Sequence, residues 1–220
     1  MAYRQTEKVA RKLAARRDAI LAAACEVATE NGIAAIQIVP IAERAGIATG
    51  TVYRYFASKG ELLAALATAL SEEEIAALDQ AAKAAPGPLS ALAAVITAFA
   101  MRALARRRLV FALTIEPVEP DLDRARRCYR EALAGYFEKL IRAAIETSHL
   151  RDKDGALAAP AVIGALIEGL VGPLAPTGPP DPIKTREQAQ RLALFALRAL
   201  GVVDARARGL VVQTAAPVQA

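Results

Sequence analysis

Apolar residues recur at helical spacing through most of the chain, and stretches rich in polar residues, glycine or proline separate the periodic segments. The first periodic segment runs from about Arg16 to the Asn31-Gly32 pair, a typical helix C-terminus. Two very short helical patterns follow, from about Ile38 to Gly46 and from Thr49, their expected cap, to Phe56. A tight glycine turn between two short helices predicts a helix-turn-helix.

A capping pattern predicts a long helix directly after these two. Ser58 precedes Glu61 by three residues, which is the spacing of a capping box, and helical periodicity continues to about Lys83. The 85–88 stretch predicts a corner, because it is too short for a free linker. Further helices are predicted over about 89–107, 109–115, 121–145, 158–172 and 184–200, after which the periodicity weakens.

The patterns together predict an all-α fold without strands or internal repeats. Alanine and leucine dominate a composition that is 55% hydrophobic, and both residues favour helices. We expect a basic arm over 1–13, a three-helix head over 14–74 with its helix-turn-helix at about 37–56, a C-terminal helical domain over 75–205 and a tail over 206–220.

Neither a membrane span nor a secretory signal is expected. We find no uncharged apolar stretch of ~18–20 residues, the length that a span requires, and the closest, over 156–176, is interrupted by Pro160, Glu168 and Pro173. The polar, basic N-terminus has no apolar signal region. Cys25 and Cys128 lack the spacing of a disulfide framework or zinc site, so we expect reduced thiols in a cytoplasmic protein.

Positive charge is concentrated at the N-terminus. Residues 1–60 hold nine lysines and arginines against five acidic residues, in a chain whose net charge is +5. Six of these basic residues stand close together: Arg4, Lys8, Arg11, Lys12, Arg16 and Arg17. A basic arm beside a helix-turn-helix suits contacts with DNA phosphates, and a solvated, disordered tail is the alternative.

Residues of about 14–74 resemble the N-terminal domain of the TetR (tetracycline-repressor) family. The matching segments are Arg17–Ala24, Gly32, Ile41–Ile47, Gly50–Phe56, Ser58-Lys59 and Leu62-Leu63. The resemblance implies a dimeric transcriptional repressor that binds a pseudo-palindromic operator in double-stranded DNA. Its C-terminal helical domain would bind a small effector and release the DNA. Such domains diverge widely, so the remaining two thirds of the chain do not identify the effector.

The helix-turn-helix supplies the expected DNA contacts. Val52 and Phe56 lie four residues apart and should anchor the second helix on its own domain. The resemblance places Tyr53 and Lys59 near phosphates, and Gln37 and Thr49 close to the DNA backbone. Arg54 could bind a guanine or a phosphate, Gly50 could allow close approach of DNA or relieve crowding between helices, and Thr51 shares the exposed surface. Gln37 also replaces the usual Ser or Thr, so this helix cap should be weak.

Two apolar helical faces near the C-terminus predict a symmetric dimer, as half-site recognition requires. The expected interface comprises Val162, Ala165, Leu166, Leu170, Leu192 and Phe195. Burial of these residues within one subunit is the alternative.

The effector pocket is expected to be mostly apolar with few polar groups. Candidate residues are Phe99, Met101, Phe111, Glu116, Tyr129, Tyr136 and Glu168. Glu168 is the only charge in 161–171, so it must find a partner, reach solvent or meet a ligand. For each candidate, a purely structural role is the alternative.

An enzyme is not expected. The chain has one histidine and no glycine-rich phosphate loop, HExxH or GxSxG motif. We predict neither a metal site nor a cofactor. The rival to a ligand-responsive repressor is a nucleoid or division factor of the same fold without an effector.

Overall fold

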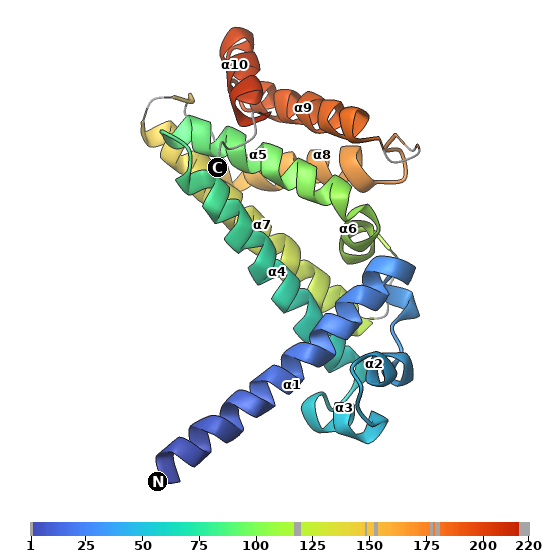
Figure 1. Cartoon of the computed structure of the whole chain (residues 1–220). Coiled ribbons are helices and arrows are strands. Elements are labelled where there is room, and N and C mark those ends of the chain that lie inside the picture. Colours follow the sequence, from blue (N-terminus) through green and yellow to red (C-terminus); the bar gives the residue numbers. More distant parts are fainter. Residues whose placement is uncertain are drawn as a thin grey trace.

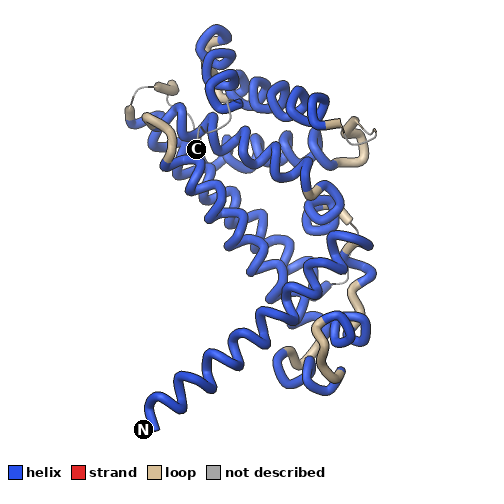
Figure 2. The backbone as a smooth tube through the Cα atoms, viewed as in Figure 1, coloured by secondary structure: helices blue, strands red, loops and turns tan. Residues whose placement is uncertain are grey.

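A computed structural model describes residues 2–116, 120–147, 149–151, 154–176, 178 and 181–215. These residues form helices joined by short turns, and none of them forms a strand (Figures 1 and 2). The predicted all-α fold is therefore confirmed. Two hydrophobic clusters are separate: one lies mainly among the N-terminal helices, which we call the head, and the other among the C-terminal helices, which we call the body.

The head is built from α1 (Ala2–Asn31), a 3-10 turn (Ile33–Ala35), α2 (Ile38–Arg44) and α3 (Thr49–Tyr55). Gly46, between α2 and α3, has a φ of 65°, a conformation that side chains with a Cβ atom rarely adopt. The sharp turn predicted at this glycine is thus present. The cap predicted at Thr49 is wrong, because Ala48 is the N-cap residue and Thr49 is already helical.

Helix α4 (Lys59–Lys83) connects the head to the body as one continuous rod. The Ser58 hydroxyl accepts a hydrogen bond from the Glu61 amide at 3.1 Å. The Glu61 carboxylate in turn accepts one from the Ala57 amide at 2.7 Å. These bonds satisfy amides that the first helical turn leaves without partners, so the capping pattern predicted here forms.

Six helices complete the body: α5 (Pro88–Ala105), α6 (Arg107–Thr114), α7 (Pro120–Glu146), α8 (Gly155–Val171), α9 (Pro182–Ala199) and α10 (Asp204–Ala215). α4 packs along α7, and α5 packs against α4, α7 and α9. In their shared core the rings of Phe99 and Phe137 meet edge to face, with centroids 6.2 Å apart. The body thus has a well-filled core around α5.

Two helical segments were not predicted. α1 begins at Ala2 rather than near Arg16, because residues 2–15 are strong helix formers without glycine or proline, although they have no long apolar stripe. α10 occupies most of the predicted tail, where Ala207, Leu210 and Val211 are buried. It packs against α5 and α9, and such tertiary packing is not visible in a short periodic pattern.

α5 is a long apolar segment that the sequence analysis did not single out. By length and composition its 18 residues could cross a membrane, and Arg102 is their only charged residue. About 56% of this helix is buried inside the protein, against α4, α7, α8 and α9. Its apolar character is therefore that of a core helix.

Candidate nucleic-acid interface

Helix α3 is held on the head by one face and leaves the other accessible. Val52 and Phe56 are buried in the head core, as their spacing predicted. On the opposite side Tyr53 is 51% exposed and Arg54 is also exposed. Thr49 and Thr51 are partly buried. The helix thus presents a phenol and a guanidinium on a fixed support.

Gln37 and Lys59 stand at the starts of the helices on either side of α3. Gln37 is the N-cap residue of α2, is exposed and makes no capping bond with its side chain, as expected for a weak cap. Lys59 is the first residue of α4 and is partly exposed. α2 and α3 pack together at the end of the molecule away from α9 and α10 (Figure 1).

Gly50 is not required by packing inside the head. A Cβ atom at this position would have no protein atom within 4 Å, and the residue is not in the left-handed region. The interpretation that Gly50 relieves crowding between helices is therefore wrong. A glycine on the exposed side of α3 instead leaves the helix backbone open to close approach from outside.

The first half of α1 projects from the head at the same end as α3 (Figures 1 and 2). Lys8, Lys12 and Arg16 are exposed and lie four residues apart, so they share one face of the helix. Val9 and Leu13 are exposed on another face, at 54% and 49%. The basic arm predicted from the sequence is therefore helical, with Lys8, Lys12 and Arg16 on one side.

Arg17 differs from the other basic residues of this arm. Its guanidinium carbon lies 5.3 Å from the centre of the Phe56 ring, a cation–π contact that joins α1 to the end of α3. Arg44 of α2 is also engaged internally, 2.9 Å from Glu30 and 3.6 Å from Glu26 of α1. The hydrogen bond from Arg44 lowers the pKa of Glu30. These two arginines fix the orientation of the helix-turn-helix.

The seven predicted effector residues have different surroundings in the part of the chain that the structure describes. Phe99 and Tyr129 are buried in the body core, where burial raises the pKa of the Tyr129 phenol. The Tyr136 hydroxyl donates to Asp79 of α4 at 3.3 Å, and Phe111 packs on the body core. Met101 alone among the seven lines a described pocket, between α4, α5 and α10.

The two acidic candidates have other surroundings. Glu116 accepts a hydrogen bond from the Ile33 amide at 3.3 Å and so connects the end of α6 to the head. Arg126 of α7 donates to the backbone oxygens of Ala112 and Glu116, which holds the same junction. Glu168 is exposed on α8, so it reaches solvent.

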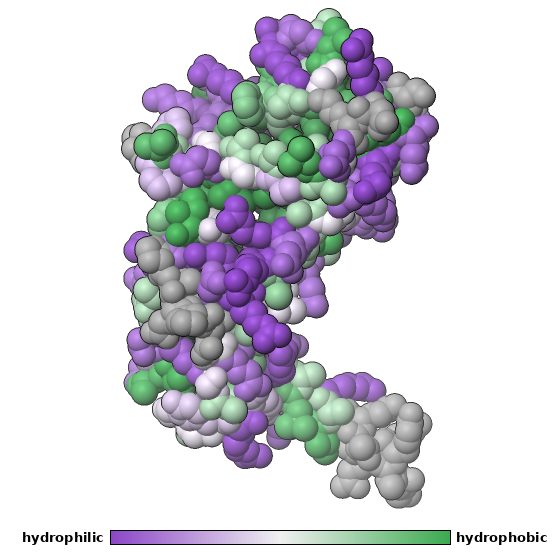
Figure 3. All heavy atoms as spheres, turned by 180° about the vertical axis from the view of Figure 1, so that it is seen from behind, coloured by the Kyte–Doolittle hydropathy of each residue, from purple (hydrophilic) through white to green (hydrophobic). Residues whose placement is uncertain are grey.

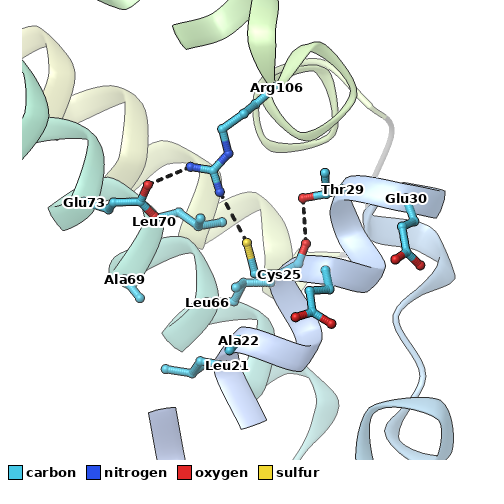
Figure 4. A pocket seen from close by; sticks show the side chains of 11 residues that line it. Leu21, Ala22, Cys25, Thr29, Glu30, Leu66, Ala69, Leu70, Glu73 and Arg106 are labelled. Carbon is cyan, nitrogen blue, oxygen red and sulfur yellow. Dashed lines mark hydrogen bonds and ion pairs between the residues drawn. The ribbon is translucent and has the colours of Figure 1, made fainter. Parts of the chain in front are cut away.

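An open cleft of about 570 Å³ lies between the head and the body, and the sequence did not predict it (Figure 4). Its walls come from α1 and α4, with Cys25 and Leu66 among the lining residues. Arg106 donates to Glu73 of α4 at 2.8 Å and to the Cys25 sulfur of α1 at 3.4 Å. One guanidinium therefore bridges the head and the body across this cleft.

A partly buried ion pair was also not predicted. Glu74 is only 8% exposed, and it accepts a hydrogen bond from Arg102 of α5 at 2.9 Å, which raises the pKa of the guanidinium. In the sequence Glu74 belongs to an acidic run, which usually marks a solvated face. Only the packing of α4 on α5 turns this residue inward.

The predicted dimer faces divide into buried and accessible parts. Val162, Leu166 and Leu170 are buried in the core of the same chain, which is the alternative left open by the sequence. A Cβ atom on Gly169 would lie 2.7 Å from a Leu192 methyl group, so the small residue serves close packing of α8 on α9. Ala165 and Leu192 are partly accessible, and Phe195 is 56% exposed. Seen from behind, the body carries apolar atoms between its polar side chains (Figure 3).

Comparison with known sequences finds a matching family model and relatives that are similar to part of the chain. The family model described as "Bacterial regulatory proteins, tetR family" matches residues 20–66. The HTH-type transcriptional repressor KstR of Mycolicibacterium smegmatis is 42% identical over 77 residues, 35% of this chain and 38% of that repressor. KstR of Rhodococcus jostii is 50% identical over 48 residues, 22% of this chain and 23% of that protein. The similarity thus spans less than two fifths of these relatives' length.

Comparison with solved structures bears on the whole chain. The structure of RolR in complex with resorcinol is 25% identical, with a TM-score of 0.67, and the match covers 92% of this chain and 95% of that one. FadR from Bacillus subtilis in complex with stearoyl-CoA is 21% identical, with a TM-score of 0.63, and covers 84% of this chain and 97% of that one. The latter similarity shows the fold alone.

Proposed function

Because this chain belongs to the TetR family of bacterial regulatory proteins, we propose that it is a dimeric, DNA-binding transcriptional repressor controlled by a small ligand. The observation that carries the proposal is the accessible face of α3. This face combines exposed Tyr53 and Arg54 with the open backbone at Gly50, and the opposite face is buried. A helix supported in this way can enter the major groove of DNA.

Each side chain of the interface has a proposed role. Arg54 binds a guanine edge or a phosphate, and Thr51 lies beside it against the DNA. Tyr53 and Lys59 bind phosphates, and Gln37 and Thr49 approach the sugar-phosphate backbone at the helix starts. The projecting half of α1 adds Lys8, Lys12 and Arg16 to the phosphate contacts.

The dimer follows from the symmetry of such sites. One helix-turn-helix contacts one half-site, and two heads related by a two-fold axis contact two half-sites about one helical turn or a multiple of it apart. We place the interface on the accessible parts of α8 and α9, around Ala165, Leu192 and Phe195. The operator is therefore a pseudo-palindrome, and we place the protein in the cytoplasm.

Control by a ligand is supported by the related structures. RolR is described with resorcinol, and FadR from Bacillus subtilis with stearoyl-CoA. A ligand releases DNA only if it binds the DNA-free arrangement more tightly than the DNA-bound one. In this chain such a change would pass through α4 and the Arg106 bridge, since both join the head to the body.

Selection of duplexes from a random DNA pool by the purified full chain tests the proposal. We expect enrichment of one two-fold symmetric sequence, bound by two chains per duplex. If no sequence is enriched over bulk DNA, the proposed function is wrong. The same assay with the variant Tyr53→Ala, which keeps the buried face of α3 intact, should show weaker enrichment.

A further inference from the structure

A second cavity lies at the far end of the body, away from the head. The last turn of α4 with the residues that follow it, the first four turns of α5 and the end of α10 line a half-open cavity of about 360 Å³. This volume is within the range of small-molecule sites in proteins. Alanines at 81, 94 and 98 line the walls together with Met101 and Leu210. The space exists because these helices place small side chains where they face one another.

None of the twelve described residues that line this cavity is charged. A charged ligand would lose part of its hydration there without meeting an opposite charge, which is unfavourable. A neutral ligand avoids this cost and gains from burial of its apolar surface. The lining therefore selects for neutral, mostly apolar molecules.

The polar groups in the cavity favour a ligand that carries a hydroxyl group. The Thr97 hydroxyl donates to the Ala93 oxygen at 2.9 Å, and the Thr214 hydroxyl donates to the Val211 oxygen at 3.1 Å. The two hydroxyl oxygens also lie 3.0 Å apart. Each hydroxyl has a single proton, so the three contacts cannot all be hydrogen bonds at once. The pair is left with acceptor capacity that a hydroxyl donor on a ligand can satisfy.

Ser90 adds a third polar group to the same wall. It is partly buried, and among the residues that the structure describes its hydroxyl makes no hydrogen bond. A serine hydroxyl can donate as well as accept. The cavity therefore offers both kinds of partner to a hydroxyl group, on an otherwise apolar surface.

We propose that the cavity between α4, α5 and α10 is a binding site for a small, neutral, mostly apolar molecule that carries a hydroxyl group. That this molecule is the effector rests on the proposed function. Helix α4 connects the cavity to the head, because it begins at Lys59 in the head and ends at Lys83 beside the cavity. A ligand that separates α10 from the end of α4 would shift this end of α4, and the continuous helix would transmit the shift to the head.

Calorimetric titration of the full chain, without DNA, tests the site with a matched series of probes. Octan-1-ol, octanoate and octylammonium share one alkyl chain and differ in charge. We expect octan-1-ol to bind at least tenfold more tightly than either ion. Equal binding of the ions, or no binding of octan-1-ol, would overturn the proposal.

Two variants locate the binding within the cavity. Ala94→Leu fills the space and should weaken octan-1-ol binding at least tenfold, whereas Thr97→Val removes a polar partner and should weaken it several-fold. Ala132→Leu makes the first substitution on the exposed surface of α7 and should bind as the wild type does. Circular dichroism checks that each variant is folded. Equal binding by Ala94→Leu and Ala132→Leu would place the alcohol elsewhere.

The role as an effector is tested separately on the selected duplex. We expect octan-1-ol to weaken DNA binding by the wild type and not by Ala94→Leu. If the alcohol binds the cavity but leaves DNA affinity unchanged, the effector assignment fails. If no duplex can be selected, the proposed function itself fails, and the calorimetric result still decides whether the cavity binds the alcohol.

Discussion

At the scale of single residues, Gly46 and Gly50 are glycines for different reasons. Gly46 has a positive φ, so the turn between α2 and α3 itself requires it. Gly50 has ordinary helical geometry and open space around its Cα atom. Packing inside the chain therefore does not require a glycine at this position, and we propose that close approach of DNA does.

The variant Gly50→Ala separates these effects. Alanine is more favourable than glycine in a helix by up to about 1 kcal/mol, so the free energy of unfolding should stay equal or rise. DNA affinity should fall at least tenfold, because the methyl group holds the helix away from the duplex. Unfolding by urea and fluorescence anisotropy with the selected duplex measure the two quantities.

Gly135→Ala is the matched control, since a Cβ atom at Gly135 on α7 also meets no atom within 4 Å. It should leave DNA affinity unchanged. Full DNA affinity in Gly50→Ala would remove the argument for close approach at this residue.

Buried tyrosines predict how stability depends on alkaline pH. Burial raises the pKa of Tyr129 above its ordinary value, and that of Tyr136 to about 12. In the unfolded chain a tyrosine ionises near pH ~10. The stability that these neutral phenols contribute is therefore complete below pH ~10 and is lost as the pH rises through the folded-state pKa values.

Tyr129→Phe cannot ionise at this position, so its free energy of unfolding should fall less than that of the wild type between about pH 10 and 12. Equal losses in urea unfolding at both pH values would contradict the burial of this phenol.

At the scale of single elements, α1 shows what the sequence pattern could and could not predict. The apolar stripe from Ile20 onward predicted the packed half of the helix, because burial imposes a 3.6-residue period. The projecting half has no such stripe, and its helical state rests on intrinsic propensity and continuity with the packed half. The sequence therefore predicted the charges of the arm and missed its helical structure.

The charged face of α1 predicts a specific salt dependence of DNA binding. Replacing Lys8 and Lys12 by glutamine should weaken binding on all duplexes alike. The slope of log K against log salt concentration should become shallower by about 0.9 for each phosphate that the arm no longer neutralises. The fold should be unaffected, because both side chains are exposed.

Lys184→Gln is the control for this prediction. It removes an exposed lysine on α9, in the body, and should leave the slope unchanged. An unchanged slope in the Lys8 and Lys12 double variant would mean that the arm stays away from DNA.

The body shows a similar division between what could and could not be predicted. The helix start after Ser58 and the corner over 85–88 followed from capping and proline chemistry, which is local. The partners of Glu74, Glu116 and Arg106 depend on how distant helices pack, so no local pattern reveals them. The predicted effector residues stay a prediction, although two of them, Phe99 and Tyr129, are buried in the core.

At the scale of the whole molecule, the proposed dimer requires an accessible apolar surface that a second copy of the chain can contact. Phe195 is a large aromatic side chain, 56% exposed on α9. Phe195→Glu should convert the dimer to monomers in sedimentation equilibrium, because it places a charge in an apolar contact. Leu174→Glu, at a residue that is 89% exposed after the end of α8, should remain dimeric. A dimeric Phe195→Glu protein would place the interface elsewhere.

Recognition of DNA by α3 can be measured by anisotropy titration of the variant Arg54→Ala. The wild type should prefer the selected duplex over a scrambled one, and the variant should bind the selected duplex more weakly. A contact of Arg54 with a guanine edge, as opposed to a phosphate, would also cost ~1–3 kcal/mol of this preference, about 5- to 150-fold. Arg208→Ala removes the same charge from exposed α10 and should behave as the wild type does. If Arg54→Ala binds the selected duplex with full affinity and full preference, Arg54 does not contact the bases and the account is contradicted.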